Sequence, residues 1–243
     1  MYVPPITNIT CEEVYNEYMS DRSKIGIPID KIKDESIIAH FSDGITMKFT
    51  NGETIINGIE EPNGVFLIQE GFIKAFSVSG EGHGYLLLIH QPGDFIPLPW
   101  ALDGAHTTGL YYQAIQNVTV IRTSKERLRT ALGTDAWLSQ EIMRQTINIL
   151  TTYTKRIQTL EFRSTRGRLI SELLNLSERF GEKHGKQILI NAPITHQDLS
   201  DSINMNRETA SRALEKLFKE GLLGQINHLF TILDLPKLQD ELK

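Results

Sequence analysis

Cysteine is nearly absent from this chain, which has only Cys11 among its 243 residues. A single cysteine cannot form a disulfide within the chain. It is also too few for a cysteine-ligated iron–sulfur cluster, which normally needs several thiolates. One chain by itself is therefore predicted to hold neither.

A long apolar run is also missing. No stretch approaches the roughly 18 apolar residues that a membrane-spanning helix needs, and no signal-peptide pattern opens the chain. We therefore expect a cytoplasmic protein without a membrane partner. The composition, 40% hydrophobic and 23% charged, is ordinary for a globular protein, and 243 residues suffice for two modest domains.

The chain has no overall excess of basic residues, since its net charge is −5. The charge is unevenly distributed, however. Residues 155–220 contain 12 Lys and Arg against 9 Asp and Glu, whereas the remainder contains 13 against 21. Affinity for nucleic-acid phosphates depends on local positive charge more than on the total, so a mildly basic C-terminal part remains compatible with DNA binding.

Residues 195–217 have the pattern of two short helices joined by a tight turn. Thr195 is a good N-cap for the first helix, and Asp198 occupies the capping-box position three residues later. Asn204 falls where the chain must turn sharply, and asparagine tolerates the left-handed conformation better than most residues. Asn206 can then cap the second helix. The segment therefore predicts a helix-turn-helix.

The second helix, about 206–219, has two different faces. Its apolar stripe consists of Ala210, Ala213, Leu214 and Leu217. Its polar residues include Arg207, Glu208, Ser211 and Arg212, with the last three at positions i, i+3 and i+4. Arginine can bind guanine and glutamate can accept from cytosine, and the N-terminal turns of a recognition helix reach base edges. We predict that these four residues contact DNA; the alternative is an ordinary amphipathic helix with a solvated charged face.

The string Asn206-Arg-Glu-Thr-Ala-Ser-Arg-Ala-Leu resembles the recognition helix of the Crp-Fnr superfamily of bacterial transcription regulators. The typical family string is Arg-Glu-Thr-Val-Ser-Arg, and only Ala210 departs from it. The resemblance implies that the positions of Arg207, Glu208 and Arg212 contact bases or backbone, and that Ser211 does so as in the Fnr branch. Lys216 and Arg166 are candidates for phosphate contacts or for simple solvated charges.

Other segments resemble the same superfamily. Residues 163–181 are similar to the first helix of its DNA-binding domain, and 225–235 to its two-stranded wing, with Asn227-His228 as the turn. Residues 64–75 and 91–95 resemble parts of its sensor domain, whereas the first 40 residues match poorly. The implied fold is α+β: an N-terminal β jelly-roll of the cyclic-nucleotide-binding kind (1–134), a dimerisation helix (135–162) and a winged helix-turn-helix domain (163–243).

The residues alone favour the same organisation. From 45 to about 124, short apolar runs alternate with turn signals, which is typical of a sandwich or jelly roll. Residues 135–162 contain neither glycine nor proline and predict one helix about 42 Å long. Its near-heptad track is Ile142, Thr146, Ile149, Tyr153 and Leu160, broadened by Ile147, Leu150 and Ile157. This stripe either packs only on its own sensor domain or forms a parallel coiled coil with a second copy, and we prefer the homodimer.

The sensor segment lacks the cationic residue that a cyclic phosphate needs. There is no Lys or Arg between Lys74 and Arg122, and Pro97 and Leu98 stand where the family's nucleotide binders have Gly-Glu. Burying a phosphate anion without a cation is unfavourable. We therefore predict that cyclic AMP does not control this chain in the usual way.

Other sensor residues suggest no defined ligand. Trp100, Tyr111 and Tyr112 either line an apolar pocket or belong to the core. The histidines of this segment, His83, His90 and His106, do not form the spacing of a cupin metal site, so we expect no metal and no cofactor.

The predicted function is a sequence-specific, homodimeric transcription regulator, not an enzyme. Its partners are double-stranded DNA and a second copy of the chain, with RNA polymerase and an unidentified small-molecule effector as further candidates. The alternatives are a cupin-like metal enzyme and a ligand-binding module without DNA function.

Overall fold

The computed structural model describes residues 41, 43–80, 82–104, 109–162 and 164–242. Of the residues named from the sequence, Cys11 and His106 lie outside these ranges. The N-terminal part contains β1 (Ile45–Phe49), β2 (Thr54–Ile56), β3 (Val65–Glu70), β4 (Ile73–Val78), β5 (Gly84–His90), β6 (Phe95–Ile96), α4 (Leu98–Ala101), β7 (Leu110–Ala114), β8 (Val118–Thr123) and α5 (Lys125–Thr134). After it come α6 (Ala136–Thr159), α7 (Thr165–Phe180), β9 (Gly181–His184), β10 (Gln187–Ile190), α8 (His196–Ser202), α9 (Arg207–Lys219), β11 (Leu223–Ile226), β12 (Leu229–Ile232) and α10 (Leu235–Asp240).

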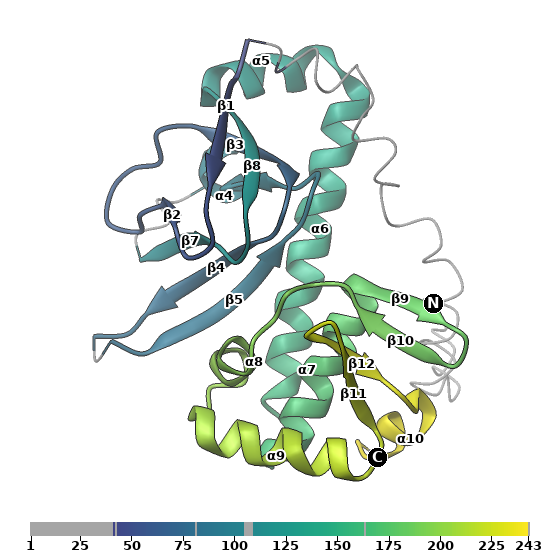
Figure 1. Ribbon diagram of the computed structural model, residues 1–243. Coiled ribbons are helices and arrows are strands. Elements are labelled where there is room, and N and C mark those ends of the chain that lie inside the picture. Colours follow the sequence, from purple (N-terminus) through teal and green to yellow (C-terminus); the bar gives the residue numbers. More distant parts are fainter. Residues whose placement is uncertain (1–40, 42, 81, 105–108, 163, 243) are drawn as a thin grey trace, which may run out of the picture.

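The N-terminal strands form two four-stranded antiparallel sheets, with strand orders β1-β8-β3-β6 and β2-β7-β4-β5 (Figure 1). Their inner faces share an apolar core because buried and more exposed positions alternate along strands such as β4 and β7. Buried members of this core are Phe66, Ile68, Leu88, Tyr112 and Val120. The predicted jelly-roll is thus confirmed.

Helix α6 begins at Ala136 after Asp135, whose side chain caps Leu138 N at 3.0 Å. It runs past the strands to the C-terminal domain (Figure 1). One side of it packs on the N-terminal domain through Leu138, Ile142 and the partly buried Ile149. The predicted single stripe is therefore wrong in detail: Ile142 and Ile149 face the chain's own sensor domain, whereas Ile147, Leu150 and Ile157 remain exposed on another face.

The C-terminal domain combines α7, the pair α8–α9 and a four-stranded sheet of order β11-β12-β10-β9. The wing is the hairpin β11–β12, and its turn consists of Asn227 and His228, both with positive φ, as the sequence predicts. A second hairpin, β9–β10, extends the sheet and was not anticipated. The α+β architecture with a winged helix-turn-helix is therefore present.

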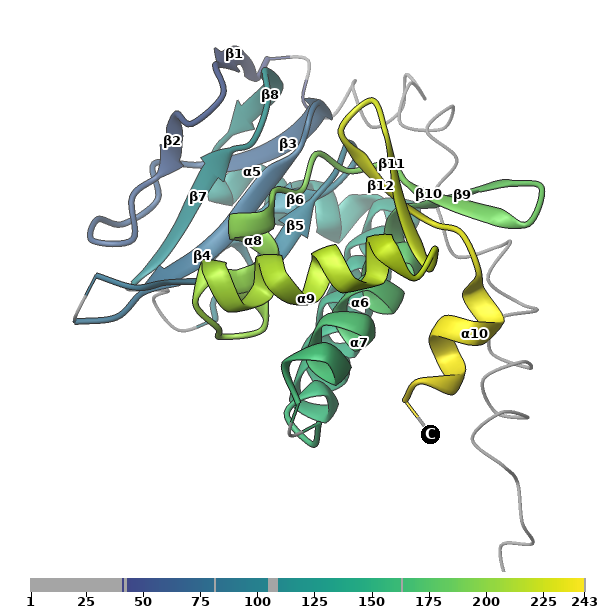
Figure 2. The ribbon, with the colours of Figure 1, turned by 60° about the horizontal axis from the view of Figure 1, so that its bottom comes forward.

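The two domains touch each other within one chain. Leu86 and Ile89 of β5 join the apolar core of the C-terminal domain, which includes Leu199 of α8. Lys74 of β4 pairs with Asp198 of α8 at 2.9 Å. Helix α8 consequently lies between β5 and α9, and α9 lies on the outer surface (Figure 1, Figure 2). None of the helices in the described part of the chain has the length and apolar character that crossing a membrane requires.

Candidate DNA-binding site

Helix α8 begins with the predicted capping box. The Thr195 hydroxyl accepts from the Asp198 backbone N–H at 3.1 Å, and the Asp198 carboxylate accepts from the Thr195 N–H at 3.0 Å. These reciprocal bonds satisfy two N–H groups that would otherwise lack partners at a helix start. The same carboxylate accepts from the Lys74 ammonium, so the cap of α8 is also a contact with the sensor domain.

The turn between α8 and α9 depends on two asparagines. Asn204 has φ +52°, in the left-handed region that asparagine tolerates. Asn206 then caps α9, because its side-chain oxygen accepts from Thr209 N at 2.8 Å. Both predicted roles are confirmed. The two asparagines thereby fix the orientation of α9 relative to α8.

The apolar stripe of α9 anchors the helix to the domain. Ala210, Leu214 and Leu217 are fully buried, and they join a core that contains Leu169 and Leu173 of α7. The small Ala210 allows α8 and α9 to approach closely. Burial of this stripe fixes the rotation of α9, so its opposite side must face outward.

That outward side carries Arg207, Glu208 and Arg212, all exposed. None of the three makes an ion pair with another described residue. Arg212 has one long contact, from Nη2 to Thr209 Oγ1 at 3.5 Å. Two guanidinium groups and a carboxylate at the N-terminal half of an exposed helix provide bidentate donors and an acceptor for base edges.

Ser211 lies elsewhere than predicted. It is half-buried, and its hydroxyl is 3.5 Å from Nδ1 of His196, the first residue of α8. It does not share the exposed face of Glu208 and Arg212, because its side of α9 turns toward α8. His196 was not among the residues that the sequence pattern indicated; its ring stacks on Phe230 of β12 at 5.7 Å between centroids. Burial, and secondarily the charge of Arg207, lower the pKa of His196.

The two candidates for phosphate contacts differ. Lys216 is exposed on α9 and pairs with no described residue. Arg166 of α7 is engaged by two carboxylates, Glu241 at 2.8 Å and Glu220, and its pKa is raised, mainly by the bond to Glu241. Arg166 therefore connects α7 with Glu220 and Glu241 through ion pairs. A DNA phosphate would have to displace both carboxylates to bind it.

In the N-terminal domain, most of the residues considered for ligand binding are packed in the core. Leu98 is buried in the core at the first position of α4. Trp100 and Tyr112 also belong to the core; Trp100 Nε1 donates to Glu61 at 3.1 Å. His90 is buried against Tyr112. Across the described residues, no group of three or more His, Cys, Asp or Glu is placed to hold a metal.

The fold and the exposed, capped α9 define a class of protein in which a β jelly-roll domain is joined by a long helix to a winged helix-turn-helix domain. Family models agree: residues 46–135 match the cyclic nucleotide-binding domain and residues 167–241 the Crp-like helix-turn-helix domain. The chain belongs to the Crp-Fnr superfamily and is a transcriptional regulator with a helix-turn-helix DNA-binding domain.

Curated relatives and solved structures are similar over most of the chain. Electron transport regulator A of Shewanella oneidensis is 26% identical over 185 residues, which are 75% of this chain and 72% of the relative. The CRP-like cAMP-activated global transcriptional regulator of Mycobacterium tuberculosis is 24% identical over 174 residues, 71% of this chain and 77% of the relative. The structure of a CooA mutant from Carboxydothermus hydrogenoformans has a TM-score of 0.71 at 20% identity and covers 84% of this chain and 90% of that one.

Proposed function

We propose that the chain acts as a homodimer on a two-fold DNA site and reads it with α9 in the major groove. Glu208 and Arg212 contact base edges, Arg207 assists from the first turn, and Ser211 contributes from its half-buried place beside His196. The observation that carries this proposal is the exposed, unpaired set of Arg207, Glu208 and Arg212 on a buried and capped helix. The relatives are regulators, so neither the cupin-like enzyme nor a module without DNA function is favoured.

The homodimer is supported by an unpartnered apolar stripe on α6. Met143, Ile147, Leu150 and Ile157 are 54–67% exposed. With the exposed Thr154 they are spaced by four, three, four and three residues, which is the a/d pattern of a coiled coil. A contiguous exposed apolar row of this kind often marks a protein–protein contact, and a second copy of the helix would cover it. A parallel pair would place two recognition helices about one DNA turn apart, roughly 34 Å.

We also propose that cyclic AMP is not the effector in the usual way. Leu98 stands, by the sequence resemblance, at the position of the ribose-binding glutamate, and its side chain is apolar and buried. No Lys or Arg is available between Lys74 and Arg122 to neutralise a cyclic phosphate. Titration calorimetry of the purified chain with cyclic AMP is expected to show no micromolar binding. Saturable micromolar binding would contradict this part of the proposal.

The DNA-binding proposal is tested by selecting bound sites from random DNA and then measuring affinity for the selected site. A two-fold consensus is expected. Arg212→Ala should weaken the free energy of binding to the selected site by about 1–3 kcal/mol, which is roughly 5- to 150-fold in affinity. It should also relax the base preference at one base pair per half-site. Arg129→Ala on α5 removes the same charge far from α9 and should leave the affinity unchanged. Equal affinity and an unchanged footprint for Arg212→Ala would refute its contact with a base.

A further inference from the structure

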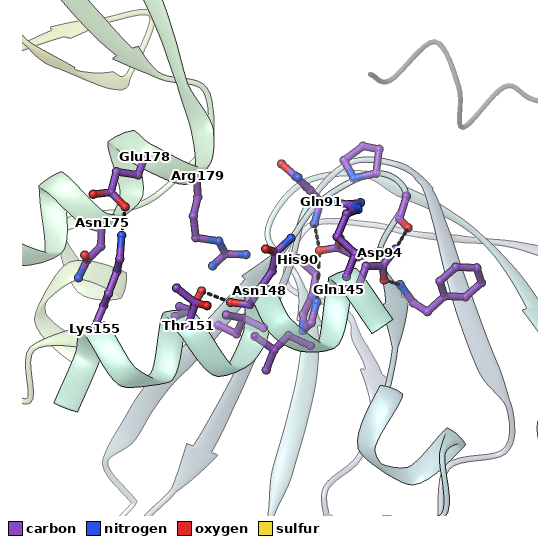
Figure 3. Close-up of a pocket in the computed structure, with 17 residues that line it drawn as sticks. His90, Gln91, Asp94, Gln145, Asn148, Thr151, Lys155, Asn175, Glu178 and Arg179 are labelled. Carbon is purple, nitrogen blue, oxygen red and sulfur yellow. Dashed lines mark hydrogen bonds and ion pairs between the residues drawn. The ribbon is translucent and has the colours of Figure 1, made fainter. Parts of the chain in front are cut away.

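A cavity of about 310 Å³ lies where α6, α7 and the turn between β5 and β6 meet. Its walls come from both domains: His90 and Asp94 from the sensor domain, Asn148 and Thr151 from α6, and Asn175 and Arg179 from α7 (Figure 3). Small-molecule sites typically measure about 300–1,000 Å³. This one is at the lower end of that range, so it suits a small ligand.

Arg179 dominates the chemistry of this cavity. Figure 3 shows its side chain extending from α7 toward Thr151 and Asn148. One nitrogen, Nη2, donates to the Ile89 carbonyl oxygen at 2.6 Å, and the guanidinium lies 4.7 Å from the centre of the Phe180 ring. Its remaining N–H groups bond to no other described residue, and it makes no ion pair among them.

This guanidinium is only partly exposed, yet it stays charged at neutral pH. Burial lowers the pKa of Arg179 to about 10, and the charge of Asp94 partly offsets the effect. A partly buried cation that lacks a direct counter-ion is unfavourable unless something else compensates it. The open donors of Arg179 therefore face a space that an anion would fill favourably.

The neighbouring groups do not supply a direct counter-ion for Arg179. Lys155 pairs with Glu178, and Arg144 pairs with Glu141, so these cations and carboxylates compensate each other. Asp94 accepts from the Gln91 N–H and lies 3.4 Å from His90 Nδ1. Asn175 adds a second unmet donor, because its Nδ2 is buried without a hydrogen-bond partner. The cavity wall thus has an excess of donors and of positive charge around Arg179.

We propose that this cavity binds a small anion carrying a carboxylate or phosphate group, held by the guanidinium of Arg179 and the amide of Asn175. The ligand would connect α7 of the DNA-binding domain with α6 and with the β5–β6 turn of the sensor domain. Its action as an effector rests on the proposed function; its binding does not. A ligand bound here stabilises the arrangement of the two domains, because it contacts both.

The test is calorimetry on the full chain in a buffer free of phosphate and carboxylates, with succinate and inorganic phosphate as the two probes. Saturable binding of either probe is expected, and the probe that binds identifies the chemical class. Arg179→Gln should weaken binding roughly tenfold to a hundredfold, because a charge-assisted hydrogen bond is lost. Arg129→Gln is the matched control and should bind as the natural chain does.

A second variant covers the case in which Arg179→Gln fails to fold. Asn175→Asp keeps the shape of the side chain and places a carboxylate beside the bound anion, so it should also weaken binding. Absence of binding of both probes at millimolar concentration overturns the proposal, as does unchanged affinity in both variants. DNA affinity measured on the same samples without added anion separates the two proposals. Anion binding without specific DNA binding contradicts only the proposed regulator function. Specific DNA binding without anion binding contradicts only the proposal that the cavity binds an anion.

Discussion

Leu150 offers a quantitative test of the homodimer. It lies in the middle of the exposed α6 stripe and is 60% exposed. Full burial of a leucine side chain is worth about 1.5–3 kcal/mol, so covering the exposed part in a dimer contributes roughly 1–1.8 kcal/mol per copy. Leu150→Ala removes most of this from both helices. The dimer should therefore lose about 2–3.5 kcal/mol, which raises its dissociation constant roughly 30- to 400-fold.

The same substitution should leave the monomer intact. Leu150 belongs to none of the buried core clusters of the described chain, and alanine has a slightly higher helix propensity than leucine. Sedimentation over a wide concentration range measures the dissociation constant, and circular dichroism checks the helix content. Ile45→Ala is the matched control, because Ile45 is 55% exposed and lies on β1, outside the α6 stripe. If Leu150→Ala associates as tightly as the natural chain, another surface forms the dimer and the argument from the stripe is refuted.

Two further predictions concern contacts of α8. Lys74→Met removes the bond to Asp198 but leaves the capping box intact. Hydrogen exchange should then report that local opening of α8 increases about fivefold, equivalent to roughly 1 kcal/mol. An unchanged exchange rate would show that the pair does not hold the domains together. The lowered pKa of His196 means that the unfolded chain takes up a proton more readily than the folded one. Stability should therefore be complete above the ordinary histidine pKa of about 6.5 and decrease as the pH falls below it. Denaturant titrations at pH 7.5 and pH 5.5 should show a smaller loss for His196→Gln than for the natural chain, and equal losses would exclude His196 as the source.

The helix-turn-helix could be predicted in detail because its signals are local. The capping box of Thr195 and Asp198 joins groups three residues apart, and so does the cap of Asn206 on Thr209. The wing turn at Asn227 likewise depends on two adjacent residues that tolerate positive φ. Such short-range bonds need no knowledge of the rest of the fold.

Contacts between distant residues escaped prediction. Arg166 was a candidate for a phosphate, but folding places it against Glu220 and Glu241, 54 and 75 residues away. Ser211 was assigned to the exposed face of α9, but the crossing of α8 brings His196 against it. The heptad pattern on α6 could not tell which apolar residues face the chain's own strands, because several phases of the helix carry apolar residues.

The sequence by itself therefore indicated the family, the order of the domains and the exposure of Arg207, Glu208 and Arg212 on α9, since periodicity and capping act within a few residues. Only the tertiary structure decided which face of α6 remains open and how the DNA-binding domain rests on β5. It also placed Arg179 beside a cavity between domains, 90 residues from the Ile89 carbonyl that it binds. The physical reason is that burial and ion pairing depend on which surfaces, far apart in the sequence, come into contact. A local sequence pattern does not specify those contacts.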